Sequence, residues 1–177
     1  MKEFERNNPY LSLCGLNCRL CPMQLSGHCG CCGFGNQGCP IVRCRMRRGE
    51  YEYCTQCPEY PCARYEHVDE YDSFITHRNQ KKDLEKLQRI GEEAYIREQQ
   101  EKRQILDRLL ADYNDDRKKT LFCLAVNLME LQTLKEILAQ ADREYSGLPL
   151  KERSTAIAQL LKNRSDIELK LRKKAKE

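Results

Sequence analysis

Hydrophobic residues recur with helical spacing through the C-terminal part of the chain. Ser73 is a predicted cap for a helix that begins at Phe74, and apolar residues then repeat three or four positions apart. Residues 97–104 interrupt this pattern with an entirely polar stretch, which predicts either the solvated middle of a long helix or a kink. Gly91 is a candidate break within the same segment.

The most apolar segment covers residues 121–138. Its apolar side chains occupy most of a helix's circumference, which is typical of a central helix that its neighbours cover. A stop and a new start are predicted at 146–149, before a third helix. The sequence therefore predicts an all-α helical bundle of three helices, or a long hairpin, over residues 73–162, and then a charged helical tail over 163–177 that frays.

Few neighbours are available to cover the predicted helix at 121–138. Part of its face is therefore expected to meet either the N-terminal region or a second chain. A homodimer through antiparallel helices is the simplest form of the second case. Asn127, a polar residue in this apolar segment, is expected to cap a packing contact or to face the N-terminal region, and Cys123 is expected to be a small buried apolar residue.

The N-terminal residues 11–66 show no helical or strand periodicity of useful length. Large apolar residues are few here, glycine and proline are frequent, and eleven of the chain's twelve cysteines fall between Cys14 and Cys62. A segment with so small a core usually needs additional staples, and bound metal would supply them. We therefore expect a small, irregular, metal-stapled cysteine-rich module, followed by the helical bundle.

The cellular compartment decides whether the cysteines are expected to bind metal or to form disulfides. The N-terminus has no apolar core of a secretory signal, and no run approaches the roughly 20 apolar residues that span a bilayer. A cytoplasmic location, without a membrane, is therefore expected, and cysteines there favour metal bonding over disulfides. The net charge of +4, from 31 basic and 27 acidic residues, makes a nucleic-acid partner unlikely on electrostatic grounds.

The cysteine spacing is compatible with two kinds of metal centre. Cys-x-x-Cys pairs suit tetrahedral zinc, with sulfur about 2.3 Å from the ion. Three closely spaced cysteines and repeated Cys-Pro steps favour [4Fe-4S] clusters, of which two are expected. Arginines bracket Cys44 and could donate to sulfur or form a solvated basic face.

The opening motif Cys-Gly-Leu-Asn-Cys-Arg-Leu-Cys-Pro at 14–22 resembles that of the bacterial and archaeal family catalogued as domain of unknown function 3795. The resemblance continues through Cys-Pro-Ile-Val-Arg-Cys at 39–44 and Cys-Thr-Gln-Cys-Pro-Glu-Tyr-Pro-Cys at 54–62, and covers about residues 11–66. It implies a cysteine-rich metal module without an assigned activity. Carried over by position, it implies as metal ligands Cys14, Cys18, Cys21, Cys39, Cys44, Cys54, Cys57 and Cys62, with Cys29 or Cys32 supplying further thiols and Cys31 as an alternate.

Two centres are expected from these ligands. The first joins Cys14, Cys18 and Cys21 to Cys57 or Cys62. The second is expected to use Cys39, Cys44 and Cys54 with one thiol from residues 29–32.

The leading hypothesis for function is an iron–sulfur protein that acts as an electron carrier or accessory subunit. The alternative is a structural zinc module that mediates protein–protein interaction. Catalysis is not expected, because no Ser-His-Asp set, carboxylate pair or phosphate loop is recognisable. The spacing at 14–21 also matches radical S-adenosylmethionine enzymes, but the later chain lacks their alternating strands and helices.

Overall fold

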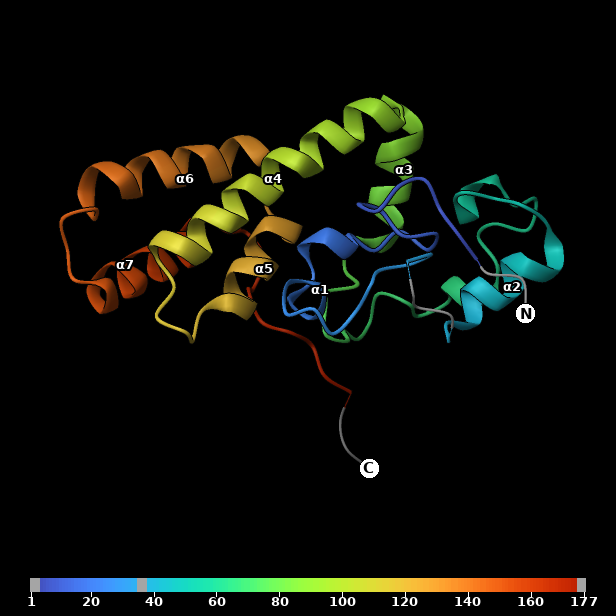
Figure 1. The fold of residues 1–177 in the computed structure, drawn as a ribbon, viewed down its shortest axis with the longest axis horizontal. Helices are drawn as coiled ribbons and strands as arrows, with labels where there is room; N and C mark the ends of the chain where they lie inside the picture. The colour runs from blue at the N-terminus through green and yellow to red at the C-terminus, as the bar shows by residue number, and fades with distance from the viewer. Residues whose placement is uncertain (1–3, 35–37, 175–177) are drawn as a thin grey trace.

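The computed structural model describes residues 4–34 and 38–174, and it places a cysteine-rich region of turns and short helices beside longer helices (Figure 1). Within these ranges no strand forms, and Leu11 and Asn17 make one isolated antiparallel bridge. No helix in the described part of the chain is long and apolar enough to cross a membrane. In chain order, the helices and 3-10 turns are η1 (Cys18–Leu20), α1 (Pro22–Leu25), α2 (Pro40–Arg48), η2 (Cys54–Gln56), η3 (Ala63–Tyr65), α3 (Gln80–Ile90), α4 (Glu92–Asp112), α5 (Lys119–Leu128), α6 (Leu131–Glu144) and α7 (Leu150–Asn163).

The break at Gly91 is confirmed, whereas the predicted helix start at Phe74 is wrong. Gly91 ends α3 and begins α4 with a φ of 82°, a conformation that glycine adopts at little steric cost. The chain before α3 forms a turn and not a helix. The Asp72 carboxylate stabilises this turn, because it accepts hydrogen bonds from the Thr76 hydroxyl at 3.1 Å and from the His77 amide at 2.8 Å. Phe74 is left 65% exposed.

The apolar segment at 121–138 forms two helices, not one. Met129 and Glu130 are extended, and they separate α5 from α6. The break lets both helices direct apolar faces into one core, which a single straight helix could not do. The longer helical part therefore contains α3 to α7, and not the predicted three helices.

A second chain is not needed to cover the most apolar part of this segment. Every residue of α5 from Phe122 to Leu128 is buried within the chain itself. The covering elements are α4, α6, α7, α1 and η1. Two roles were expected for Asn127, and the structure shows the second: it faces the cysteine-rich region. Its side-chain amide donates to the Leu20 carbonyl at 3.4 Å.

The polar stretch at 97–104 lies within α4 and is not fully solvated. Gln99 and Lys102 are only 2% and 6% exposed. The Lys102 ammonium lies 3.7 Å from the Glu98 carboxylate on the same helix, which offsets part of the cost of burying its charge.

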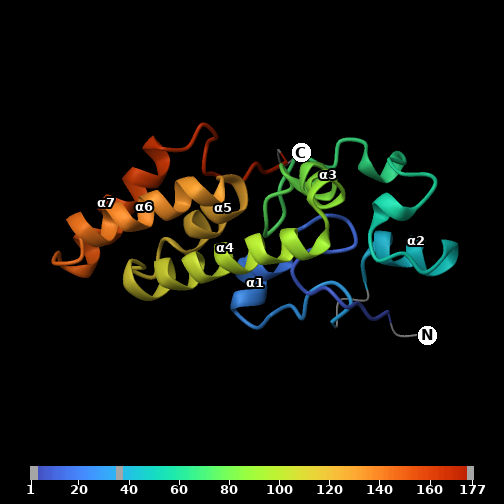
Figure 2. The ribbon, with the colours of Figure 1, turned by 90° about the horizontal axis from the view of Figure 1, so that it is seen from above.

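The C-terminal tail is not helical where the structure describes it. Helix α7 ends at Asn163, and residues 164–174 return toward α3 (Figure 2). The Arg78 guanidinium donates to the carbonyls of Glu168 and Lys170, both at 2.7 Å. These bonds hold the segment in an extended path, and residues 175–177 of the predicted tail lie outside the described residues.

The cysteine-rich and helical regions share apolar cores. The largest cluster joins Leu20 to residues of α4, α5, α6 and α7. A second cluster joins Leu11 and Tyr65 to Leu84 and Tyr95. The thiol-bearing turns are therefore packed directly against the helices.

Candidate metal centre

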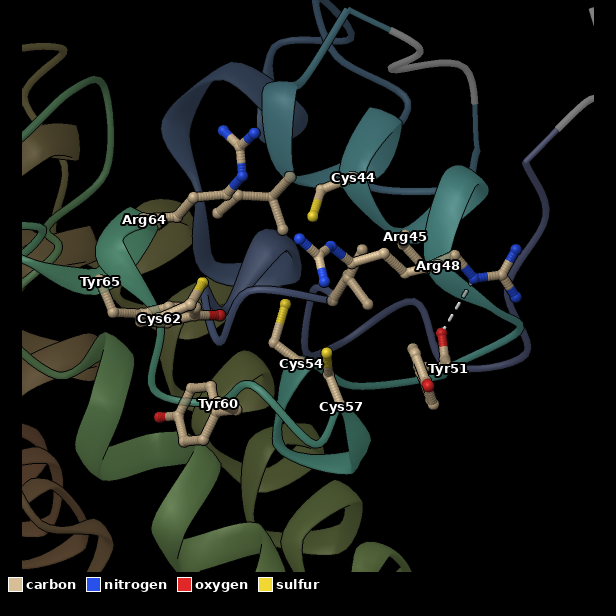
Figure 3. Close-up of a pocket in the computed structure, with 12 residues that line it drawn as sticks. Cys44, Arg45, Arg48, Tyr51, Cys54, Cys57, Tyr60, Cys62, Arg64 and Tyr65 are labelled. Atoms are coloured by element: carbon tan, nitrogen blue, oxygen red, sulfur yellow. Dashed lines mark hydrogen bonds between the residues drawn. The ribbon is translucent and has the colours of Figure 1, made fainter.

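Four cysteines from three separate segments line one small cavity (Figure 3). Cys44 reaches from α2 toward the opposite wall, where η2 begins at Cys54 and is followed by Cys57, while Cys62 precedes η3. The Cys57 amide donates to the Cys54 carbonyl at 3.0 Å and closes the η2 turn. Because a 3-10 turn aligns residues three apart, the Cys-x-x-Cys spacing turns both sulfurs to one side. We call these four residues the α2 thiol set.

The surroundings of the α2 thiol set are apolar, aromatic and cationic. Its cavity has a volume of about 30 Å³, close to the volume that one water molecule occupies in the liquid. Leu13, Ile41 and two tyrosine rings enclose it, and the rings of Tyr60 and Tyr65 meet edge to face with centroids 4.8 Å apart. Three arginines also line it: Arg45, Arg48 and Arg64.

The neutral thiol is the stable form of Cys54 in the absence of a cation. Burial raises the pKa of Cys54 to about 12, against the opposing effect of a hydrogen bond from the Tyr65 hydroxyl, and the neighbouring thiols of Cys14, Cys62 and Cys44 raise it further. A bound metal cation removes this penalty, because it stabilises the thiolate directly.

A second group of four cysteines lines another cavity, around η1. These residues are Cys18, Cys21, Cys29 and Cys31, which we call the η1 thiol set, and their cavity has a volume of about 490 Å³. The Cys21 amide donates to the Cys18 carbonyl at 3.1 Å, which closes a 3-10 turn like that of η2. His28 and Phe74 line the same cavity.

Cys18 and Cys31 are hydrogen-bonded to each other within the η1 thiol set. Their mutual hydrogen bond raises the pKa of Cys18 and lowers that of Cys31. In this hydrogen bond the Cys18 thiol donates to the Cys31 sulfur, so Cys31 loses its proton more readily than Cys18. Cys31 has a φ of 72°, which is strained for a residue with a side chain and is typical of functional sites.

Cys14, Cys32 and Cys39 are not among the residues that line either cavity. Cys14 and Cys32 are nevertheless buried enough that burial raises their pKa values to about 12 and about 11. We call these three residues the remaining thiols. Cys123 is buried in α5, where burial raises its pKa to about 12, as expected for a small apolar residue.

This grouping differs from the pairing that the sequence predicted. Cys57 and Cys62 share a cavity with Cys44 and Cys54, and they do not line the cavity of Cys18 and Cys21. The physical reason is that η1 and the following loop close upon themselves, while α2 faces the η2 turn. In the described ranges no three or more Cys, His, Asp or Glu side chains already converge as an ion would require, so binding needs the thiols to turn inward.

Two arginines lie beside the thiols, of which the sequence indicated Arg19, between Cys18 and Cys21, but not Arg6. The Nε atoms of Arg6 and Arg19 are buried and lack a hydrogen-bond partner among the described residues. Burial raises the pKa of Cys32, and the positive charge of Arg6 opposes this effect, as it opposes the raised pKa of Cys18. The Cys18 hydrogen bond and then the charge of Arg19 lower the pKa of Cys31. Arg6 lies outside the cysteine motifs, and the fold is what brings it beside the thiols.

The chain matches no protein-family profile, no curated protein sequence and no solved structure. The resemblance to domain of unknown function 3795 therefore stays a prediction. The metal-site interpretation depends on the arrangement of the chain's own thiols.

Proposed function

We propose that this protein is a zinc-binding protein in which the metal is structural and fixes the cysteine-rich turns against the helices. The observation that carries the proposal is the α2 thiol set, in which four cysteines from three segments line one cavity. Tetrahedral coordination by four thiolates is the usual geometry of structural zinc.

Electrostatics support the same proposal. Four thiolates around one divalent zinc leave a net charge near −2, which favours nearby cations. Arg45, Arg48 and Arg64 line the cavity, although Arg48 also pairs with Glu59 and the Arg45 Nε donates to the Tyr51 carbonyl. The free thiols gain nothing from these cations while they remain protonated. The arginines therefore favour a centre whose sulfurs are ionised by metal.

Metal analysis of the purified protein tests this proposal. We expect zinc in stoichiometric amount, and we expect cobalt substitution to give the thiolate-to-metal absorption of a tetrahedral site. Cys57→Ser should lower the zinc content and weaken that absorption. Cys123→Ser is the matched control, because it makes the same chemical change in α5 at a residue that lines neither cavity. Absence of bound metal from protein prepared with zinc would overturn the proposal.

An iron–sulfur centre at the η1 thiol set is the second candidate. Its cavity of about 490 Å³ is much larger than that of the α2 thiol set, and it provides room for a cluster. Such a centre would make the protein an electron carrier or an accessory subunit. Anaerobically purified protein that is brown and contains iron and acid-labile sulfide would favour this candidate, whereas colourless protein with zinc would reject it.

A further inference from the structure

The segment after α7 is fastened to a turn that lies far from it in the sequence. Residues 164–174 return toward the part of the chain that precedes α3 (Figure 2). There they contact the turn of residues 72–78, and the hydrogen bonds between the two segments join residues 90 to 100 positions apart. We call residues 164–174 the strap and residues 72–78 the strap-bound turn.

Asp72 and Arg78 fasten the strap at the two ends of this turn. The Asp72 amide donates to the Arg172 carbonyl at 2.7 Å, and the Arg172 amide donates to the Asp72 carboxylate at 2.8 Å. The Arg78 guanidinium donates to the carbonyls of Glu168 and Lys170. The Asp72 side chain is fully buried and lies 3.8 Å from the Arg78 guanidinium. Three of these four hydrogen bonds involve a charged side chain, and bonds of this kind are the stronger ones.

The strap-bound turn is also a wall of the η1 thiol cavity. Ser73, Phe74 and Ile75 line that cavity together with the η1 thiol set. Phe74 and Ile75 also line a second, smaller cavity, which Leu171 of the strap borders. The same two side chains therefore border both the thiols and the strap.

The strap-bound turn depends on the strap for much of its position. Phe74 is 65% exposed, and Ile75 is the one buried apolar residue among residues 72–78. The bonds of the Asp72 carboxylate to Thr76 and His77 lie within the turn, so they shape it without fixing it to the rest of the protein.

The strap itself is held by contacts that open easily. Of residues 164–174, all of which the structure describes, only Leu169 is buried. The bonds from Arg78 to the strap, and the bond from the Arg172 amide, are exposed to solvent. Segments with few buried apolar contacts and exposed hydrogen bonds open at a much lower free energy than the whole protein unfolds.

We propose that the strap is a latch that controls access to the η1 thiol set. While the strap is docked, it holds Phe74 and Ile75 as a wall of the thiol cavity. When the strap opens, the wall moves away and thiol-reactive solutes reach the sulfurs. This inference goes beyond the proposed function, which rests on the α2 thiol set.

Alkylation measured at each cysteine tests the latch. The full-length protein and a variant that lacks residues 164–177 are treated with iodoacetamide or with a bulky maleimide, and mass spectrometry gives the rate at each thiol. The η1 thiol set should react at least about tenfold faster without the strap, because the hydrogen bonds that hold the closed state are gone. The increase should be larger for the bulky reagent. The α2 thiol set is the internal control, since none of the strap or of the strap-bound turn lines its cavity, and its rates should not change.

Arg78→Gln tests the latch in a chain of full length. It removes the guanidinium that donates to two strap carbonyls, so it should speed alkylation of the η1 thiol set by less than deletion of the strap does. Arg97→Gln is the matched control, because Arg97 is 64% exposed and pairs with Glu93 on its own helix. This control should leave all rates unchanged.

Phe74→Ala shows whether the wall and the strap act on the same opening. This change should speed alkylation of the η1 thiol set by itself, and deletion of the strap should then add little, because both changes open one cavity. Unchanged rates at the η1 thiol set after deletion of the strap would overturn the inference. Equal increases at both thiol sets would also overturn it, because they would indicate a general loosening of the fold. Neither result would alter the zinc content expected at the α2 thiol set, so failure of the latch is distinguishable from failure of the proposed function.

Discussion

The cysteine-rich region and the helices α4 to α7 are stabilised by different means. The helices bury leucine, isoleucine and phenylalanine side chains in one large cluster, and apolar burial of this kind stabilises by roughly 25 cal/mol per Å². The cysteine-rich residues bury few large apolar side chains, and their interior contains thiols whose pKa values are raised by burial. If the proposed metal-binding function holds, the first region should depend on its bound ligand for stability and the second should not.

The two regions are nevertheless not independent. Leu20 belongs to the helical core, and Leu11 packs with Leu84 and Tyr95. Metal bound among the turns would therefore also stabilise the helices that contact them. The following experiments measure how far the two kinds of stabilisation can be separated.

Metal removal should have the largest effect. We expect a strong chelator to abolish hydrogen-exchange protection over the turns of residues 11–34 and 38–66, because metal-binding energy becomes folding energy where the core is small. Helices α5 to α7 should keep most of their protection, since their core does not include the thiol sets. Unchanged protection of the turns after complete metal removal would contradict the comparison.

Truncation of Leu20 should show how far the stability of the helices depends on a side chain from the cysteine-rich region. Leu20 is fully buried and lies in the largest cluster with α4 to α7. Leu20→Ala should lower the free energy of unfolding by about 2–5 kcal/mol, as measured by chemical denaturation of the metal-loaded protein. The control is Leu148→Ala, at a residue that is 36% exposed. If both variants lost the same small amount, the shared core would contribute nothing to stability.

Local sequence signals identified much of this organisation. The helical character of the later chain, the break at Gly91 and the role of Asn127 were all predicted, because each depends on propensity or on a polar residue in an apolar segment. The concentration of cysteines also marked the region of both thiol sets.

Long-range contacts determined the features that sequence did not predict. The extended residues Met129 and Glu130, and the path of residues 164–174, follow from packing and from hydrogen bonds across the fold. The grouping of Cys44 with Cys57 and Cys62 likewise depends on how α2 faces the η2 turn. The spacing of residues along the chain does not predict such contacts between distant segments.

A methyl group at Gly15 should measure the close contact between the first thiol turn and α3. Gly15 has a φ of 95°, and a Cβ atom there would lie 2.2 Å from the Gln80 carbonyl oxygen. Gly15→Ala should therefore destabilise the protein by about 2–3 kcal/mol through strain and displacement. Gly27→Ala is a matched control, because Gly27 also has a positive φ, of 72°, but open space around its Cα. Equal destabilisation by the two substitutions would show that the contact with α3 is unimportant.

The buried carboxyl of Asp83 should make stability depend on pH. Burial raises the pKa of Asp83 to about 6, against the opposing effects of Lys102, of the Asn17 and Tyr95 hydrogen bonds and of Lys86. Because the folded state holds this proton more tightly than the unfolded state, its contribution favours folding at acid pH and is lost as pH rises toward about 6. The loss should be about 3 kcal/mol.

Asp83→Asn isolates this contribution, because asparagine cannot ionise. Stability of both proteins should be measured by denaturation between about pH 4 and about pH 7, a range that covers the ordinary and the raised pKa of an aspartate. Release of metal at acid pH acts in the opposite direction in both proteins, so the difference between them is the quantity to compare. Parallel pH profiles for the two proteins would contradict the assignment.

Loss of the Tyr65 hydroxyl should have the smallest effect on stability and a specific effect on the metal. This hydroxyl donates to the Cys14 carbonyl at 3.2 Å, and the Cys54 sulfur is a second acceptor within its reach. Tyr65→Phe keeps the ring, so we expect a loss of about 1 kcal/mol in the free energy of unfolding. Because groups that hydrogen bond to ligands tune metal affinity by about 10–100-fold, zinc should bind more weakly at the α2 thiol set. Tyr60→Phe is the matched control, since its ring packs against Tyr65 in the same cavity. The measurement is competition with a zinc chelator. Equal zinc affinity for Tyr65→Phe, Tyr60→Phe and the unmodified protein would show that the cavity holds its thiols without help from the Tyr65 hydroxyl.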